Sequence, residues 1–413
     1  MPTTKLSTKQ NMLWNSFGSL IFLGFQWLTT VVVVRLSNGY EVAGQLALSM
    51  AIYNAIAPLA IYRMYTYQVS DIHRENSAGE YIAFRMVTCL IALFVGIVYG
   101  FSISPASSYA AIALFILYRI PGLLIDVLHG TDQLNSRMDF VGKSLALQGI
   151  CTFLSFCVCM VAFQSLEISI LSMALVTSLI GLFYDYPRTN KLEKIHIGIT
   201  ADKTAHLLKL CFPIVAAAVA CSLAPSIPRQ FLAISEGESS LGIYASVAAP
   251  IAIIQMGASY IYNPLLGSFS SLYSEGNIKK LMLLLGKVTL GILAIGIVSA
   301  VILVFIGSPL LALLYGSDIT AYLYLINPLI ACSLIIAYVW FLNDLFVSFR
   351  LFKYSFLSNI LSLILSLALT IPLVNAFSMN GVSFVGIAGY GATAILMVIF
   401  LKKALSAKAQ KQP

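Results

Sequence analysis

Charged residues are scarce in this sequence. Lysine, arginine, aspartate and glutamate together make up 10% of its 413 residues, whereas 59% are hydrophobic. A soluble globular protein typically carries about 25% charged residues, so this chain has too few charges to hydrate its surface. Lipid must be the solvent for most of it, and we predict an all-α integral membrane protein.

Motifs for metal or nucleotide binding are also missing. The seven cysteines fall inside apolar stretches, at spacings that match no metal site. The histidines lie in or beside polar loops without a cysteine or glutamate at ligand spacing; they are His73, His129, His196 and His206. No segment resembles a nucleotide-binding loop. We therefore predict no metal, no cofactor and no enzymatic activity.

Long apolar runs, by contrast, fill the chain. A helix needs roughly 20 apolar residues to cross the hydrocarbon core of a bilayer. Twelve runs meet this requirement, at residues 12–35, 44–66, 82–103, 107–127, 142–164, 166–186, 208–232, 240–267, 284–307, 319–347, 354–375 and 381–401. The first run is longer than the roughly 7–15 apolar residues of a signal peptide, so we predict that it too spans the membrane.

Basic residues are nearly absent on one side of the predicted membrane. Alternating the twelve spans places all but two of the 24 lysines and arginines on the side of the N-terminus, and the exceptions are Arg35 and Arg229. The positive-inside rule therefore predicts that both termini are cytoplasmic. This asymmetry accounts for the net charge of +8, so we do not infer a nucleic-acid partner.

No predicted segment outside the membrane is long enough to fold as a domain. The longest is the cytoplasmic linker 188–207. Its brevity argues against a polysaccharide polymerase, a glycosyltransferase or a channel with a regulatory domain. The predicted organisation is an N-terminal six-helix lobe (1–187), this linker, a C-terminal six-helix lobe (208–401) and a basic cytoplasmic tail (402–413).

The two predicted lobes share a pattern after their first span. The segment LSNGYEVAGQLALS (36–49) aligns without gaps with ISEGESSLGIYASV (234–247), and Gly39 matches Gly237. Because each lobe has an even number of spans, both run in the same direction through the membrane. Parallel repeats that enclose a central cavity are a transporter architecture.

Proline is concentrated at the start of the second lobe, at Pro213, Pro225, Pro228, Pro250 and Pro264. A proline inside a helix leaves a carbonyl without its donor. The cluster predicts a broken first helix in this lobe and a bending or gating element in its first two spans. For any single proline, a packing kink is the alternative.

Arg119 is the deepest predicted charge in the membrane. A charge at this depth is costly and marks a candidate functional residue. Asp126 lies about two helical turns later on the same face. We predict that Arg119 faces a cavity and binds substrate, and that Asp126 is a candidate for ion coupling. A local Arg119–Asp126 ion pair is the alternative.

Arg63 extends a polar stripe on the second span. On a straight helix it would share a face with Ser49, Tyr53, Tyr67 and Asp71. We predict that Arg63 binds substrate and that Asp71 couples ion movement. The alternatives are an Arg63 side chain that reaches from the helix end to the headgroups and a structural salt bridge at Asp71.

Arg35 and Arg229 are related by the repeat. Each lies near the outer end of the first span of its lobe. Arginine suits phosphate, because its planar fork donates two hydrogen bonds and stays charged. We predict that both bind substrate, with headgroup contact as the alternative for Arg35. Gln255 and Tyr262 share one helix face and are predicted sugar contacts, although such aromatic stripes commonly pack helices.

Several segments resemble a known family; they are NMLWNSFGSL, QWLTTVVVVRLSNGYEVAGQLALSMAI, YRMYTYQVSD, LYRIPGLLIDVLHGTDQLNSRMDFVGKSL and LGIYASVAAPIAIIQM. They resemble, through loose motifs over nearly the whole chain, the bacterial O-antigen and capsule repeat-unit flippases of the Wzx type. These belong to the MATE-like multidrug/oligosaccharidyl-lipid/polysaccharide exporter superfamily. The resemblance implies an inner-membrane protein that moves undecaprenyl-pyrophosphate-linked oligosaccharide from the cytoplasmic to the periplasmic leaflet.

The resemblance also implies a cationic cavity, for which Arg35, Arg63, Arg119 and Arg229 are the matching positions. Expected partners are the lipid-linked glycan, membrane lipids, H⁺ or Na⁺ as coupling ion and other polysaccharide assembly proteins. One alternative is a multidrug cation antiporter of the same fold, which would place unpaired acids in the cavity. A membrane acyltransferase would need a catalytic histidine, and a peptidoglycan-precursor flippase tends to have more than twelve helices.

Overall fold

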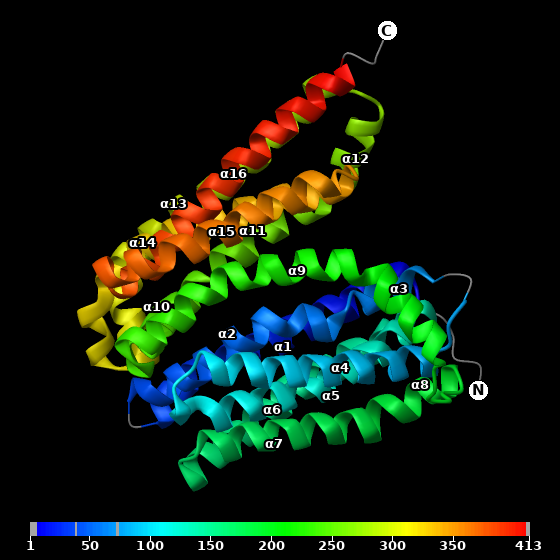
Figure 1. Ribbon diagram of the computed structural model, residues 1–413, viewed down its shortest axis with the longest axis horizontal. Helices are drawn as coiled ribbons and strands as arrows, with labels where there is room; N and C mark the ends of the chain where they lie inside the picture. Colours follow the sequence, from blue (N-terminus) through cyan, green and yellow to red (C-terminus); the bar gives the residue numbers. More distant parts are fainter. Residues whose placement is uncertain (1–5, 38, 72–73, 410–413) are drawn as a thin grey trace. The chain divides into compact units, whose positions relative to one another are not determined.

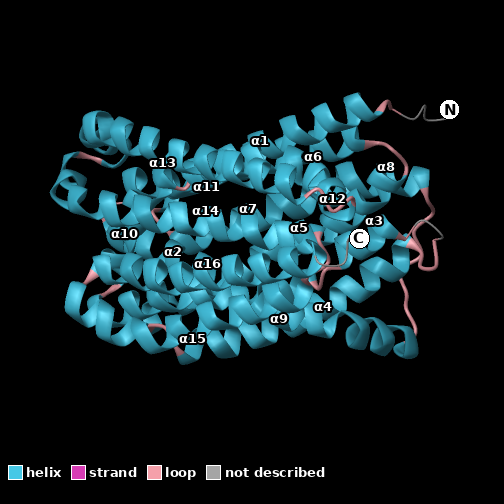
Figure 2. Ribbon diagram, turned by 90° about the horizontal axis from the view of Figure 1, so that it is seen from above, coloured by secondary structure: helices cyan, strands magenta, loops and turns pink. Residues whose placement is uncertain are grey.

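The computed structural model describes residues 6–37, 39–71 and 74–409. Within these ranges the chain is helical without a β-strand, and loops occur at the helix ends (Figure 2). Twelve helical segments of the described chain are long and apolar enough to cross a membrane. The predicted all-α architecture with twelve spans is therefore confirmed. Of the basic residues and histidines counted above, Lys5, His73 and Lys411 lie outside the described residues.

The chain forms two compact units, Met1–Ser222 (unit 1) and Leu223–Pro413 (unit 2). Their boundary falls inside helix α9. The predicted division into two lobes at the linker 188–207 stays a prediction. The first part of α9 packs on unit 1, since Leu207, Cys211 and Val215 are buried in one cluster with residues of the preceding helices. This packing assigns those turns to unit 1.

In the residues that the structure describes, unit 1 contains eight α-helices and the start of α9 (Figure 1). Its elements are α1 (Thr8–Leu36), α2 (Tyr40–Ile61), α3 (Met64–Ser70), α4 (Ala78–Ser102), the short η1 (Ala106–Ser108), α5 (Tyr109–Leu134), α6 (Met138–Phe163), α7 (Leu166–Ile180), the π-helix η2 (Gly181–Asp185), α8 (Tyr186–Leu192) and α9 (Ala201–Glu236).

Helices α1 and α6 approach closely because glycines line their contact. A Cβ atom on Gly18 would lie 2.2 Å from the carbonyl oxygen of Gly142, and one on Gly142 would lie 2.2 Å from that of Trp14. Small residues allow membrane helices to pack backbone against backbone. This contact holds together two helices that line the cavity described below.

Two left-handed residues end α2 within the second span. Tyr62 and Arg63 have φ angles of 46° and 55°, so the carbonyls of Ala60 and Ile61 lack their usual helical donors. Both carbonyls accept hydrogen bonds from Arg85 of α4, at 3.0 Å for Ala60. The polar stripe predicted through Arg63 required a straight helix, and the structure does not have one here.

Unit 2 contains the remaining helices (Figure 1). After α9 these are α10 (Glu238–Ile251), α11 (Ile253–Tyr262), the short η3 (Asn263–Leu265), α12 (Leu266–Ser274), α13 (Ile278–Tyr315), η4 (Ser317–Leu325), α14 (Ile326–Ser348), α15 (Phe352–Phe377) and α16 (Met379–Ala409).

The aligned glycines of the predicted repeat have the same structural role. Gly39 and Gly237 precede the first residues of α2 and α10, with φ angles of 144° and 88°. Backbone conformations with φ in this range are readily adopted only by glycine. Each unit therefore begins its second span with the same kind of turn.

The predicted break in the first span of the second lobe is not present, because α9 continues through all three of its prolines. Pro228 cannot donate a hydrogen bond to the carbonyl of Ala224. The hydroxyl of Ser366 in α15 donates to that carbonyl at 2.6 Å instead. The next span is divided, since α10 ends just after Pro250 and η3 contains Pro264.

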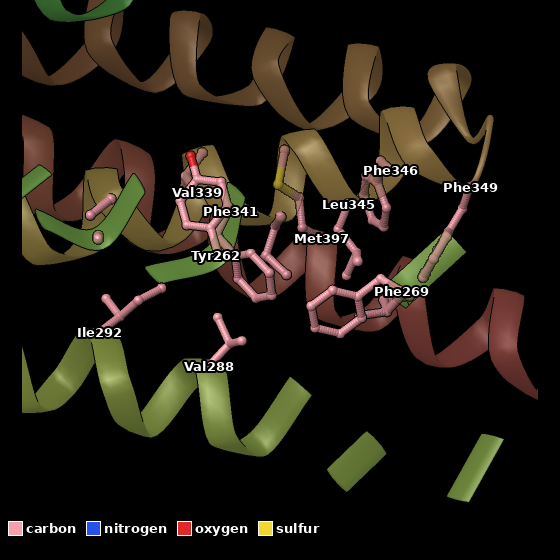
Figure 3. Packing of buried hydrophobic residues seen from close by; sticks show 14 of the residues in the cluster. Tyr262, Phe269, Val288, Ile292, Val339, Phe341, Leu345, Phe346, Phe349 and Met397 are labelled. Carbon is pink, nitrogen blue, oxygen red and sulfur yellow. The ribbon is translucent and has the colours of Figure 1, made fainter. Parts of the chain in front are cut away.

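The core of unit 2 is rich in aromatic side chains from α11, α12 and α14 (Figure 3). The ring centroid of Phe341 lies 5.3 Å from that of Tyr262 and 5.7 Å from that of Phe269. Tilted aromatic pairs at this distance add stability beyond the burial of apolar area. Tyr262 is therefore a core residue of unit 2.

Candidate functional site

A cavity of about 330 Å³ lies within unit 1. Helices α1, α2, α3, α5, α6 and α7 contribute to its wall. Its main polar residues are Tyr65, Tyr118, Arg119, Asp126, His129 and Gln148. Because a polar cavity inside membrane-spanning helices is costly to maintain, it is the leading candidate for a functional site.

Arg119 contributes a guanidinium group to the wall of this cavity. Its Cζ atom lies 5.0 Å from the ring centroid of Tyr53 and 5.8 Å from that of Tyr118. Among the described residues no carboxylate lies within 4.0 Å of it, and its Nε atom is buried without a hydrogen-bond partner. The alternative Arg119–Asp126 ion pair does not form. A guanidinium at this depth without an anionic partner suits an anionic ligand.

Asp126 pairs with Arg85. Its Oδ2 atom accepts a hydrogen bond from Arg85 Nη2 at 3.1 Å. The side chain of Arg85 is fully buried, whereas 36% of the Asp126 side chain is exposed. The charge of the carboxylate is thus balanced from outside the cavity, and ion coupling by Asp126 stays a prediction.

A buried polar network lies on the next turn of α5. His129 Nε2 lies 3.3 Å from Asp185 Oδ1, and Ser144 donates to Asp185 Oδ2 at 2.9 Å. Gln148 donates to Ser144 at 3.0 Å, so the network reaches from η2 to the cavity wall. The prediction that His129 lies in or beside a polar loop is wrong, because α5 extends to Leu134 and buries the imidazole.

The other predicted arginines are not part of the cavity lining. Arg35, in the last turn of α1, and Arg63, between α2 and α3, are exposed. Arg229 is exposed on the part of α9 that belongs to unit 2. Of the four arginines, the structure brings only Arg119 into this cavity, and substrate contact by the others stays a prediction.

Gln255 and Tyr262 lie in α11 and bond to α14 within unit 2. Gln255 Nε2 donates to Ser333 Oγ at 3.3 Å, and Tyr262 donates to Asp344 Oδ2 at 3.0 Å. Tyr262 is only 2% exposed. Both side chains stabilise unit 2 in this structure, so their predicted contact with sugars stays a prediction.

Asp71 follows the end of α3 and does not line the cavity. It accepts hydrogen bonds from the Tyr81 hydroxyl at 2.7 Å and from the backbone N–H groups of Glu75 and Asn76 at 3.0 and 3.1 Å. Burial opposes ionisation, but these hydrogen bonds outweigh it and lower the pKa of Asp71 below its ordinary value. This geometry caps a loop, and ion coupling by Asp71 stays a prediction.

Three charged residues of these networks were not identified from the sequence. Arg85 was counted only as a basic residue of one membrane side, and Asp185 was taken as the end of a span. Asp344 could have been found, because it is an acid within the predicted span 319–347. Within the described residues, no group of three or more histidine, cysteine, aspartate or glutamate side chains could hold a metal ion.

Comparisons with known proteins identify the fold. No protein-family model matches the sequence. The capsular polysaccharide biosynthesis protein CapF of Staphylococcus aureus is 23% identical over 298 residues, covering 71% of this chain and 74% of that protein. The lipid II flippase MurJ, in an inward closed conformation, superimposes with a TM-score of 0.73 at 12% identity, covering 98% of this chain and 90% of MurJ.

An inward-facing multidrug resistance MATE transporter of the MOP superfamily superimposes with a TM-score of 0.69 at 13% identity, covering 98% of this chain and all of that one. This chain has the MATE-type transporter fold. With its twelve spans, the MATE-type fold makes it a multi-pass membrane protein. In unit 1 of this fold, the cavity around Arg119 is the candidate site.

Proposed function

We propose that this protein is a flippase that moves undecaprenyl-pyrophosphate-linked oligosaccharide from the cytoplasmic to the periplasmic leaflet of a bacterial inner membrane. The observation that carries the proposal is the Arg119 guanidinium, which lines a cavity without a carboxylate partner among the described residues. The fold shared with a lipid II flippase and the sequence similarity to a capsular polysaccharide biosynthesis protein support it.

Arg119 would bind the pyrophosphate of the carrier. Its planar fork can donate two parallel hydrogen bonds to phosphate oxygens. The rings of Tyr53 and Tyr118 hold the guanidinium in place, which reduces the conformational entropy lost on binding. Since Arg85 balances Asp126, the carboxylate does not cancel the attraction of Arg119 for an anion.

The same proposal includes a mechanism of alternating access by the two lobes and an orientation with both termini in the cytoplasm. It also includes coupling to H⁺ or Na⁺ through Asp126 or Asp71. The second candidate function is a multidrug cation antiporter, which the shared fold also supports. It is disfavoured because a cationic drug requires an unpaired acid, and the carboxylate of this cavity pairs with Arg85.

The test is a deletion strain complemented with variants of the full chain. We expect the strain to lose surface polysaccharide and to accumulate lipid-linked repeat units inside the cell. Arg119→Ala should abolish complementation and Arg119→Lys should partly retain it. Lys194→Ala, an exposed residue that does not line the cavity, is the matched control.

Two results would overturn the proposal. Full complementation by Arg119→Ala, at wild-type protein levels, would remove Arg119 from the mechanism. Normal surface polysaccharide in the deletion strain, together with altered resistance to cationic dyes, would favour the multidrug antiporter.

A further inference from the structure

A second pocket, of about 340 Å³, lies at the basic end of the span Leu166–Leu192. Helix α6, the π-helix η2 and helix α8 form its wall, which includes Phe140, Phe183, Tyr184, Pro187, Arg188 and Lys191. It shares no lining residue with the Arg119 cavity. Two cationic side chains and three aromatic rings therefore meet in a site that the proposed transport mechanism does not use.

Aromatic rings hold Arg188 in this pocket. Its Cζ atom lies 4.1 Å from the ring centroid of Tyr184 and 5.5 Å from that of Phe140. Within the described part of the chain, no carboxylate lies within 4.0 Å of Arg188 or Lys191. The pocket thus has a positioned guanidinium and a lysine without anionic partners.

Asp139 and Asp185, which flank this wall, are bonded elsewhere. Asp139 accepts two hydrogen bonds from Arg137, at 2.8 and 2.9 Å. Asp185 bonds to His129 and Ser144 inside the unit. These contacts leave both positive charges of the pocket without an anion from the protein, so it favours an anionic ligand.

The wall of the pocket also contains a polar atom without a partner. The hydroxyl oxygen of Tyr184 is buried and makes no hydrogen bond with the described residues. The π-helix η2 contributes to this arrangement, since it turns Asp185 inward while Tyr184 and Arg188 line the pocket. Such π-helical turns are frequent at functional sites.

An apolar stripe leads along α7 and η2 to the pocket. Leu175, Leu179, Leu182 and Phe183 are 58%, 53%, 59% and 72% exposed, and Phe183 belongs to the pocket wall. Figure 1 shows α7 along one edge of unit 1. In a membrane span such side chains face lipid, so acyl chains along this stripe would end at the basic pocket.

We propose that the pocket binds the phosphate headgroup of an anionic glycerophospholipid from the surrounding bilayer. Arg188 and Lys191 bind the phosphate, the ring of Tyr184 positions Arg188, and the acyl chains lie along the apolar stripe of α7 and η2. Basic pockets between membrane helices recognise lipid headgroups in this way. A soluble phosphate would use the same cations but would gain nothing from the stripe. The site does not depend on the proposed transport activity.

The test is native mass spectrometry of the full chain in mild detergent, titrated with phosphatidylglycerol, phosphatidylcholine or inorganic phosphate. We expect one tightly bound phosphatidylglycerol, with weaker binding of phosphatidylcholine and no displacement by millimolar phosphate. The double variant Arg188→Gln/Lys191→Gln should weaken it about thirtyfold, which corresponds to about 1 kcal/mol for each basic residue. The control Lys194→Gln/Lys209→Gln removes two exposed charges that do not line the pocket and should change binding less than about threefold.

Three results would overturn the proposal. Equal losses in both double variants would mean that surface charge alone attracts the lipid. Equal affinity for phosphatidylcholine would exclude recognition of the anionic headgroup. Displacement of the lipid by inorganic phosphate would identify a site for a soluble anion. If the double variant does not fold, the single variants Arg188→Gln and Lys191→Gln replace it, and wild-type affinity in both would equally reject the site.

Discussion

Removing the buried guanidinium of Arg85 should destabilise unit 1 more than removing the carboxylate that balances it. Arg85 satisfies the carbonyls of Ala60 and Ile61 at the end of α2 as well as the carboxylate of Asp126. Replacing Asp126 leaves the two bonds from Arg85 to these carbonyls in place, whereas replacing Arg85 removes all three contacts. The two ends of this pair are therefore not equivalent.

The substitution Arg85→Met keeps the length and much of the volume of the side chain. It leaves the Ile61 carbonyl without its Arg85 donor, at a cost of about 1–3 kcal/mol, while Thr88 still donates to Ala60 at 2.9 Å. Together with the loss of a partly screened ion pair, we expect Arg85→Met to lower the free energy of unfolding by about 2–4 kcal/mol. Asp126→Asn keeps an acceptor for Arg85 and should cost about 1–2 kcal/mol.

The double variant Arg85→Met/Asp126→Asn should cost about as much as Arg85→Met alone, because no buried cation then lacks its anion. The expected coupling energy is about 1–2 kcal/mol. The measurement is denaturant unfolding in mild detergent, followed by tryptophan fluorescence. A Trp340→Phe background leaves only Trp14 and Trp27, both in unit 1, as reporters. A coupling energy below about 0.5 kcal/mol, or a larger cost for Asp126→Asn than for Arg85→Met, would refute the reasoning.

Three further outcomes follow from the same contacts. Because hydrogen bonds lower the pKa of Asp71, Asp71→Asn should destabilise the protein at neutral pH, and the difference from wild type should shrink below about pH 4; a constant difference in unfolding temperature would contradict this. Gly18→Ala should cost at least about 1–3 kcal/mol in the same unfolding assay, since its Cβ would lie 2.2 Å from the backbone of α6, whereas Gly24→Ala meets nothing within 4 Å and should be tolerated. Tyr262→Phe should destabilise unit 2 by about 1.5–3 kcal/mol, because Asp344 loses a donor; unchanged stability with lost transport would instead support its predicted sugar contact.

Hydropathy predicted the spans well because insertion of a helix into lipid is a local requirement. The run 107–127, for example, is apolar enough to span by itself, and all but its first two residues lie in α5. The repeat was also visible in the match of Gly39 with Gly237, and the structure adds that both glycines have a positive φ angle. The depth of Arg119 followed from the same one-dimensional reading.

Hydrogen-bond and ion-pair partners on other helices could not be predicted from the sequence. Asp126 lies on the same helix face as Arg119, yet it pairs with Arg85 from another helix. The three prolines of α9 predicted a break, but Ser366 supplies a donor for the Ala224 carbonyl and the helix continues. In both cases the group that makes the contact, Arg85 or Ser366, is distant in the sequence, so the local pattern cannot predict it.

By itself, the sequence determined that this is an all-α membrane protein, where its spans lie and which charges enter them. The sequence suffices for this because the free energy of transferring each residue from water to lipid is largely independent of the other residues. The tertiary structure alone decided which of those charges are neutralised. A charge in the membrane is compensated only by groups within a few ångströms, and packing brings those groups together. For that reason Arg85 became a structural residue, while Arg119 was left facing a cavity.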